Sequence, residues 1–434
     1  MERIDVERLY IFGLLYWCGR FRNRFLPEGI NMMSKAELKE KLYEELKVKN
    51  TVSIEGVSVR PETFKNLDLG KTYQEQIHGQ SEGDHETHVG IDFPCSYTTP
   101  NGFRVQFKWN RRSPYSIETD GSRYFLALDG IEIFPIEFDR RPKYYDLFTS
   151  DGAEMSHVGN FTQSGTVHVT YSNECSLKDR GQDCLFCNVN ATKDVYGAIE
   201  RHKWKYPKQI GETVKAAYDE GVAHHVNLTG GFVAERRELD YYIDVAEAIQ
   251  EHTGLQDFNG TAVIGAPLDL STIERYKEAG YRTVAINIEI WDKNIFKTIV
   301  PGKDQQCGRR ENWLRAIEHA RDVFGFGRAR TGIVAGLEPK TSLLEGVEYF
   351  AEKGIPALTS AWNPNPGSAL EGHRTPEPEW HWDVAQKTFS IYRKNGITFQ
   401  HLADSSPSSD FLICDFYRIE DETLPVEPGR FIVA

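Results

Sequence analysis

Three of the seven cysteines, Cys175, Cys184 and Cys187, lie within a segment of thirteen residues. Thiolates are good ligands for zinc and for iron–sulfur clusters, and the other four cysteines are scattered along the chain. A cubane iron–sulfur cluster normally takes four thiolates, so three thiolates leave one iron open to bind a further molecule. The crowding therefore favours a [4Fe–4S] cluster on these three residues, with one coordination position available for chemistry.

Two other classes of protein compete with this interpretation. A structural zinc site usually takes its four ligands as two separated pairs, and no second Cys-x-x-Cys occurs in the sequence. His224 or His225 could still complete a Cys₃His set, which would make the chain a zinc-stabilised binding protein with no redox activity. An α/β-hydrolase-like enzyme finds little support, because the sequence has no Gly-x-Ser-x-Gly motif.

The cysteines follow the first strand of a repeated strand–loop–helix pattern. The expected strands are Val167–Tyr171, His225–Leu228, Thr261–Gly265, Thr283–Ile290, Thr331–Gly336 and Ala357–Ala361. The expected helices are Pro207–Glu220, Glu238–His252, Leu270–Ala279, Arg310–Val323, Leu343–Lys353 and Trp382–Lys394. This alternation predicts an α/β fold with parallel strands, a partial (β/α)6 TIM-like barrel, to which Ile397–Leu402 could add one more strand. Because reactive groups of such barrels lie at the carboxyl ends of strands, the cysteines stand where a reaction centre is expected.

The rest of the chain differs from the barrel pattern. Residues 1–143 are expected to form an N-terminal α+β region, helical at first and then rich in short strands with Asn-Gly and Asp-Gly turns. Residues 144–402 are expected to form the barrel, and residues 403–434 a C-terminal extension. The N-terminal region could cover the barrel mouth as a lid or act as an accessory binding module.

At the cysteines the sequence resembles the radical S-adenosylmethionine superfamily, and within it the biotin-synthase-like and Elp3-like cores. The usual signature of the superfamily is Cys-x₃-Cys-x-aromatic-Cys. Phe186 fills the aromatic position before Cys187, whereas the first gap has eight residues instead of three. The resemblance implies a [4Fe–4S] cluster on Cys175, Cys184 and Cys187, with Phe186 beside the cofactor.

Further along, Thr229, Gly230 and Gly231 resemble the Gly-Gly-Glu motif with which the superfamily contacts the methionine part of S-adenosylmethionine, although Phe232 replaces the acidic residue. Glycine allows a backbone to approach a ligand closely, but an ordinary strand-to-helix turn also favours Gly-Gly.

The fourth expected strand places Asn287 and Glu289 on one face, since strand side chains alternate with a period of two. Buried polar side chains need partners. The stretch is similar to the Asn-x-Asp that contacts the cofactor's ribose in biotin-synthase-like members; the alternative is an internal network with an Arg or Lys from a neighbouring strand.

The fifth expected strand resembles the superfamily's Gly-x-Ile-x-Gly strand, which packs beside the adenine. The resemblance implies that Val334 contacts the base and that Gly336 leaves room for it. Arg330 is a candidate partner for the methionine carboxylate, because a guanidinium binds a carboxylate bidentately. Arg309 and Arg310 compete for that role.

The resemblance implies an enzyme that cleaves S-adenosylmethionine reductively and starts radical chemistry on a small-molecule substrate, with a flavodoxin- or ferredoxin-like electron donor. Transfer of the 3-amino-3-carboxypropyl group remains an alternative reaction. Substrate contacts are expected after the sixth strand, in a loop rich in hydrogen-bonding side chains: Thr359, Ser360, Trp362, Asn363 and Asn365. The same loop could instead be a rigid surface connection.

Composition limits the partners. The formal net charge is −13 and both signs are mixed along the chain, which argues against nucleic-acid and membrane-surface binding. The apolar stretch from Leu9 to Cys18 is too short to span a membrane and is expected to be a buried helix. A cytoplasmic protein is the expectation.

Overall fold

The computed structural model describes residues 34–60, 62–65, 67, 94, 96–162, 164–172, 175–187, 204–364, 367–405 and 411–424. The chain divides into two compact units, residues 1–42 and 43–434. The first unit is described only from residue 34, just before helix α2 (Lys35–Glu55), and all the described strands belong to the second unit. The Leu9–Cys18 stretch lies outside the described residues. No described helix is long and apolar enough to cross a membrane.

A seven-stranded sheet forms the larger part of the second unit, in the order β12-β11-β10-β9-β8-β7-β6. Its strands are β6 (Asn160–Thr162), β7 (Thr166–Thr170), β8 (His225–Thr229), β9 (Gly260–Val263), β10 (Tyr281–Ala285), β11 (Ala329–Ala335) and β12 (Ala357–Ala361). Strands β7 to β12 are parallel, and β6 pairs antiparallel with β7. The predicted α/β partial barrel is confirmed, with β6 as an unpredicted addition at one edge.

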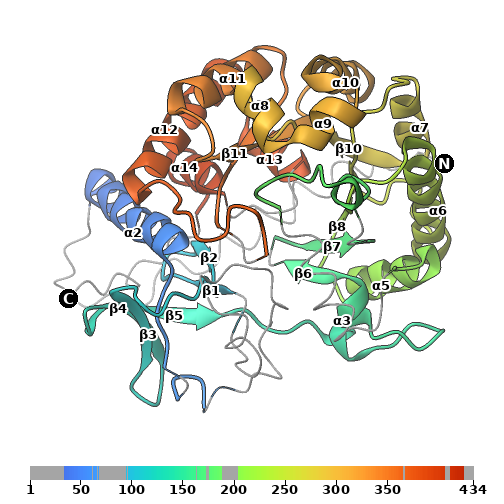
Figure 1. Cartoon of the computed structure of the whole chain (residues 1–434). Helices are drawn as coiled ribbons and strands as arrows, with labels where there is room; N and C mark the ends of the chain where they lie inside the picture. Colours follow the sequence, from blue (N-terminus) through green and yellow to red (C-terminus); the bar gives the residue numbers. More distant parts are fainter. Residues whose placement is uncertain are drawn as a thin grey trace, which may run out of the picture. The chain divides into compact units, whose positions relative to one another are not determined.

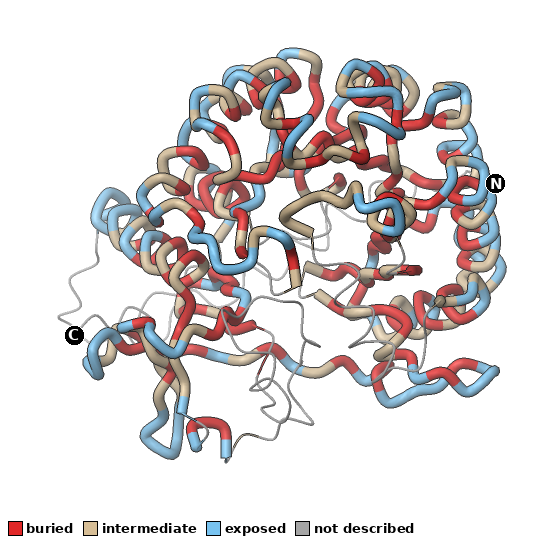
Figure 2. Tube along the Cα trace, viewed as in Figure 1, coloured by how far each residue is buried: buried red, intermediate tan, exposed pale blue. Residues whose placement is uncertain are grey.

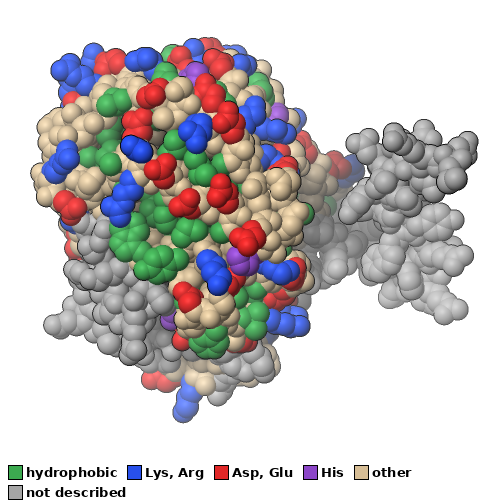
Figure 3. Space-filling view, turned by 90° about the vertical axis from the view of Figure 1, so that its right-hand side faces the viewer, with side chains coloured by type: hydrophobic (Ala, Val, Ile, Leu, Met, Phe, Trp, Pro, Cys, Tyr) green, Lys and Arg blue, Asp and Glu red, His purple; other side chains and the backbone are tan. Residues whose placement is uncertain are grey.

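Helices cover the outer face of the curled sheet (Figure 1). They are α5 (Pro207–Asp219), α6 (Glu235–Thr253), α7 (Thr272–Glu278), α10 (Arg309–Phe324), α11 (Lys340–Glu352) and α12 (Pro378–Lys394). The short elements η3 (Lys143–Asp146) and α3 (Met155–Val158) precede the sheet. The strands of this sheet are mostly buried, whereas the helices alternate buried and exposed positions (Figure 2), as amphipathic crossovers should. On the face shown in Figure 3, acidic and basic side chains are interspersed, consistent with the mixed charge along the sequence.

Two of the strand predictions need correction. Strand β10 ends at Ala285 rather than Ile290, and Glu289 has a φ of 71°, a backbone conformation that a regular strand does not contain. The predicted strand Ile397–Leu402 is wrong, since helix α13 (Phe399–Ser405) lies there. Thr398 starts that helix through reciprocal hydrogen bonds: its N–H donates to His401 Nδ1 (3.1 Å) and its Oγ1 accepts from the His401 N–H (3.4 Å).

Helices α8, α9 and α14 had no counterpart among the predicted elements. Helix α8 (Lys293–Ile299) is capped by Asp292, whose Oδ1 accepts from the N–H groups of Asn294 and Ile295 at 2.8 and 2.9 Å. Helix α9 (Pro301–Gln306) follows directly, with a proline at its first position. Helix α14 (Leu412–Glu420) ends the described part of the chain.

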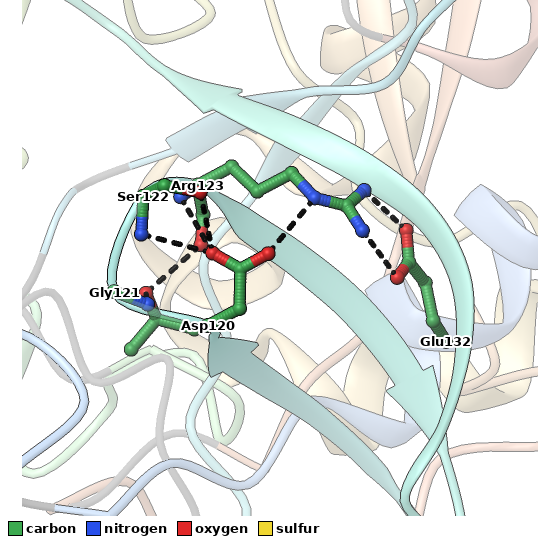
Figure 4. A network of polar contacts seen from close by, with 6 residues as sticks. Asp120, Gly121, Ser122, Arg123 and Glu132 are labelled. Carbon is green, nitrogen blue, oxygen red and sulfur yellow. Dashed lines mark hydrogen bonds and ion pairs between the residues drawn. The ribbon is translucent and has the colours of Figure 1, made fainter.

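A second, antiparallel sheet has five strands in the order β2-β1-β5-β4-β3. They are β1 (Ser96–Thr98), β2 (Arg104–Gln106), β3 (Tyr115–Thr119), β4 (Tyr124–Leu128) and β5 (Ile131–Phe138). The expected Asp129-Gly130 turn joins β4 to β5, with φ values of 50° and 79° that suit a tight hairpin. At the β3–β4 turn, Asp120, Ser122, Arg123 and Glu132 form an exposed polar network (Figure 4). Because it is exposed, that network stabilises the hairpin only weakly.

Candidate active site

The carboxyl edge of the parallel sheet carries most of the segments in which sequence analysis placed site residues. The cysteine loop follows β7, the Gly-Gly segment follows β8, and Asn287 and Glu289 follow β10. All these strands run in the same direction, so their carboxyl ends lie along one edge.

The cysteine loop is partly folded. Its eight-residue gap contains the 3-10 helix η4 (Lys178–Arg180), and the Cys175 carbonyl accepts from the N–H groups of Lys178 and Asp179 at 3.1 and 3.2 Å. The Cys187 N–H donates to the Cys184 carbonyl at 3.0 Å. All three cysteines are partly buried, and the described residues contain no group of three or more His, Cys, Asp or Glu side chains arranged to hold a metal ion.

The segment from Cys175 to Cys187 packs against α8 and α9, two helices that sequence analysis did not anticipate. The Leu185 N–H donates to the Ile299 carbonyl at 2.9 Å, and the Gly302 N–H to the Gln182 carbonyl at 3.0 Å. A Cβ atom on Gly302 would lie only 2.4 Å from that Gln182 oxygen, so glycine is needed for this close approach. The eight residues between Cys175 and Cys184 are therefore held against α9 by this contact.

Lys303, next to Gly302, holds together the polar groups that follow β10. Its Nζ donates to the Asn287 carbonyl at 2.7 Å and to Glu289 Oε1 at 2.9 Å, and it lies 4.3 Å from the centre of the Trp313 ring. Burial alone would lower the pKa of Lys303, but the negative charge of Glu289 opposes it and the pKa is raised. The lysine therefore stays charged beside the cysteine loop.

The Cys184 thiol is strongly affected by its surroundings. Burial raises its pKa, and the charge of Lys303 opposes that effect. Glu289, Cys187 and Cys175 add to the rise, so all four groups are close enough to influence Cys184. A thiol must lose its proton to bind a metal, and Lys303 favours that loss.

Asn287 offers a polar atom that the protein itself does not satisfy. Its Oδ1 is buried and has no hydrogen-bond partner, and Gly332 is so close that a Cβ there would lie 3.1 Å from this oxygen. A buried acceptor without a partner is costly, and a ligand hydroxyl would satisfy it. Three thiols on one loop and an unsatisfied amide oxygen near the same edge fit the chemistry of a cluster with a nucleoside-bearing cosubstrate.

The Gly-Gly segment approaches the protein's own side chains. A Cβ on Gly230 would lie 2.4 Å from the ring of Tyr171, and the Gly231 N–H donates to the Ser172 carbonyl at 3.0 Å. The Thr229 carbonyl accepts from the Tyr171 N–H at 2.9 Å. The close approach of Tyr171 requires a glycine at position 230 whether or not a ligand is bound. The hydrogen bonds join the Gly-Gly segment to the residues just before the cysteine loop.

Arg330 and Val334 are buried in β11, whereas Gly336 directly follows the strand and is partly buried. Arg330 Nε donates to the Ser405 carbonyl, and burial lowers the arginine pKa to about 10. The Val334 N–H donates to the Glu289 carbonyl at 2.8 Å. A Cβ on Gly336, which has a φ of 119°, would lie 2.8 Å from Pro376. Arg330 thus anchors α13.

The remaining predicted positions are dispersed. Phe186 is partly buried within the cysteine loop. Arg310, a competitor of Arg330, donates through Nε to the Trp291 carbonyl at 2.9 Å, and Arg309 begins α10 with a φ of 63°. Neither is shown in contact with the cysteine loop.

The predicted substrate loop lies beyond β12. Thr359, Ser360 and Asn363 line a cavity, whereas Trp362 is buried with its Nε1 unpartnered. Asn365 lies outside the described residues. Three of the five predicted substrate positions therefore share one cavity.

Glu238, in the first turn of α6, was not anticipated as a residue of interest. Its side chain is buried, and its Oε2 accepts from the Gly265 N–H at 3.3 Å and from the Tyr276 hydroxyl at 3.5 Å. Burial raises its pKa from 4.5 to about 8. The surrounding sequence is that of an ordinary helix start, so only the tertiary fold reveals the burial.

We expect Glu238→Gln to flatten the pH dependence of stability. Because the pKa of Glu238 is raised in the folded state, its stabilising contribution is complete below pH 4.5 and is lost as the pH rises toward 8. Relative to the variant, the wild type should lose about 3 kcal/mol of unfolding free energy between pH 5 and pH 8. Urea unfolding of both proteins at these two pH values measures the difference; parallel curves would contradict it.

Residues 169–339 match the family model described as the radical SAM superfamily, and they cover the end of β7 and all of β8 to β11. This segment of the chain is therefore similar to the radical SAM superfamily. The match supports an enzyme, and similarity to this superfamily implies an iron–sulfur cluster and S-adenosylmethionine.

Two curated relatives share part of the chain. It is 28% identical over 241 residues to bacteriochlorophyllide c C-7(1)-hydroxylase of Chlorobaculum limnaeum, covering 52% of this chain and 60% of that protein. It is 22% identical over 250 residues to an uncharacterized protein of Methanocaldococcus jannaschii, covering 56% and 59%. The chain thus spans about 60% of the length of these relatives.

Similar solved structures include methylornithine synthase, with 18% identity, a TM-score of 0.40, and 53% of this chain and 62% of that chain covered. Another is coproporphyrinogen III oxidase from Escherichia coli, with 14% identity, a TM-score of 0.35, and 57% and 58% covered.

Proposed function

We propose that the chain binds a [4Fe–4S] cluster through Cys175, Cys184 and Cys187 and uses it to cleave S-adenosylmethionine reductively. The observation that carries the proposal is the setting of Cys184, whose loop docks on α9 beside the charged Lys303–Glu289 pair, within a radical SAM domain. When bound, the cluster supplies the electron that breaks a carbon–sulfur bond of the sulfonium and so generates a radical able to abstract hydrogen.

The residues of this chain would bind and orient the cosubstrate. Asn287 Oδ1 and the Glu289 carboxylate are acceptors suited to ribose hydroxyls, and Lys303 holds Glu289 in place. Thr229, Gly230 and Gly231 supply main-chain groups near the cysteine loop, and Val334 with Gly336 would line the adenine. For Arg330, the bond to Ser405 favours a positioning role over a contact with the methionine carboxylate.

For the reaction itself, we propose attack on an unactivated carbon–hydrogen bond of a small biosynthetic substrate. The hydroxylase among the relatives supports this reaction class. An electron donor of the flavodoxin or ferredoxin kind would reduce the cluster.

The test is anaerobic reconstitution of the full chain with iron and sulfide, followed by reduction with dithionite in the presence of S-adenosylmethionine. We expect a brown protein with about four irons per chain and formation of 5′-deoxyadenosine. Methylthioadenosine in its place would indicate transfer of the 3-amino-3-carboxypropyl group. A colourless protein that retains one zinc would overturn the proposal in favour of a zinc-stabilised binding protein.

A further inference from the structure

Arg330 is a buried cation without an ion-pair partner in the described part of the chain. The residue lies in β11 and is only 6% exposed. Its Nε donates to the carbonyl of Ser405, and this is its single hydrogen bond to the residues that the structure describes. A guanidinium has five N–H groups, so the two terminal amino groups of Arg330 have no acceptor among these residues.

Such a cation destabilises the empty protein. Arginine keeps its charge at physiological pH, and a buried charge without a counter-ion is strongly unfavourable. Ser405 ends helix α13, and the negative end of a helix dipole amounts to about half a charge at most. Glu289 also acts on Arg330, but its carboxylate is paired with Lys303 at 2.9 Å. An anionic ligand would supply the counter-charge that Arg330 lacks.

Arg330 faces the side of the sheet that carries the candidate cofactor site. Side chains alternate along a strand, so Arg330, Gly332 and Val334 share one face of β11. Gly332 lies against Asn287, since a Cβ at position 332 would be 3.1 Å from the Asn287 Oδ1. A group held by Arg330 would therefore lie on the face of the sheet where the cosubstrate is proposed to bind.

The polar side chains of the neighbouring strands are neutral. His225 Nε2 of β8 is hydrogen-bonded to Thr261 Oγ1 of β9 at 2.8 Å, and Thr261 is hydrogen-bonded to Thr283 of β10. Burial lowers the pKa of His225 to about 3, and the charge of Arg330 contributes to that lowering. The imidazole is therefore uncharged at neutral pH, although it is close enough to be affected by Arg330. These groups can hydrogen-bond to a polar ligand, but they do not neutralise the guanidinium.

We propose that Arg330 binds a carboxylate of the substrate on the inner face of the sheet. This inference rests on the proposed function and adds to it the class of substrate, an organic acid. The two terminal amino groups would hold the carboxylate as a bidentate pair, while Nε stays bound to Ser405. Arg330 is then a specificity-determining residue that selects an acid over a neutral molecule of the same shape.

The probe for the test is butyrate, compared with butyramide, which has the same size but no charge. Binding to the purified, iron-free full chain is measured by ligand-detected NMR titration. We expect the acid to bind at least about tenfold more tightly than the amide. Arg330→Gln removes the charge but keeps an N–H donor for the Ser405 carbonyl, and it should weaken binding of the acid about tenfold and leave the amide unchanged. Arg330→Lys keeps the charge but loses the bidentate geometry, so its affinity for the acid should lie between those of the wild type and Arg330→Gln.

Arg328→Gln is the matched control, because Arg328 is exposed and lies just before β11. We expect this variant to bind butyrate as the wild type does. Thermal unfolding identifies any variant that fails to fold, and the preference of the wild type for the acid is measured without a variant. Equal affinity for acid and amide overturns the inference. So does a folded Arg330 variant with wild-type affinity for butyrate, or an equal loss in Arg328→Gln.

The methionine part of S-adenosylmethionine also carries a carboxylate, so a second experiment separates the two sources. Binding of S-adenosylmethionine to the reconstituted chain is compared between the wild type and Arg330→Gln. We expect the substitution to weaken butyrate binding by a larger factor than it weakens S-adenosylmethionine binding. Equal factors would assign Arg330 to the methionine carboxylate and overturn the inference.

The butyrate titration needs neither iron nor reductant, so the two proposals fail separately. A chain that prefers the acid but holds no iron after reconstitution overturns the proposed function alone. A chain that forms 5′-deoxyadenosine but does not prefer the acid overturns only the role of Arg330.

Discussion

Replacing Cys184 with alanine is expected to reduce bound iron from about four atoms per chain to nearly none after anaerobic reconstitution. Three thiols are the minimum for a cubane with one open iron, so two cannot hold it. The fold should survive, because the hydrogen bond between Cys187 and residue 184 uses main-chain atoms only, and so do the bonds of Leu185 to Ile299 and of Gly302 to Gln182. Iron analysis and the visible spectrum measure the effect.

Cys414→Ala provides the matched control. Cys414 is buried in α14, away from the cysteine loop in the sequence, and its loss should cost only some packing energy. We expect that variant to keep its full iron content. Retention of all the iron by Cys184→Ala would contradict the cluster assignment, and equal loss by both variants would point to a general folding defect.

Lys303→Met is expected to lower the unfolding free energy of the metal-free protein by about 3 kcal/mol. The side chains of Lys303 and Glu289 are 13% and 17% exposed, so removal of the ammonium leaves a carboxylate that is largely buried and uncompensated. The contact between the ammonium and the Trp313 ring is lost as well. Urea unfolding measures the change.

A double-mutant cycle with Glu289→Leu separates the ion pair from the packing. If the pair is the cause, the double variant should be more stable than Lys303→Met alone, because no unpaired charge remains. A loss below about 1 kcal/mol for Lys303→Met would mean that solvent reaches the pair and that it behaves like a surface ion pair.

The parallel sheet could be predicted because its signals are local. Strands such as Ala357–Ala361 are short apolar runs, and the following amphipathic helices carry a period that the sequence displays directly. Strand β6 and helices α8 and α9 escaped prediction because they are short and have little periodicity. At Ile397–Leu402 the apolar pattern suited a strand, but the capping contacts between Thr398 and His401 favour a helix.

The candidate site, too, could be predicted where its signals are local in the sequence and not where they depend on packing. The crowding of Cys175, Cys184 and Cys187 is visible in the sequence, whereas the role of Lys303 depends on how α9 packs against the residues that follow β10. Asn287 and Glu289 were expected to share a strand face. They instead meet one lysine of helix α9, Asn287 through its main-chain carbonyl and Glu289 through its carboxylate, whereas the alternative interpretation expected an Arg or Lys on a neighbouring strand.

Helix α9 places two adjacent residues against different parts of the site, Gly302 against the cysteine loop and Lys303 against Glu289. A displacement of α9 would therefore change the path of the cysteine loop and the orientation of Glu289 together. One short helix thus couples the segment that carries the thiols to the carboxylate that follows β10.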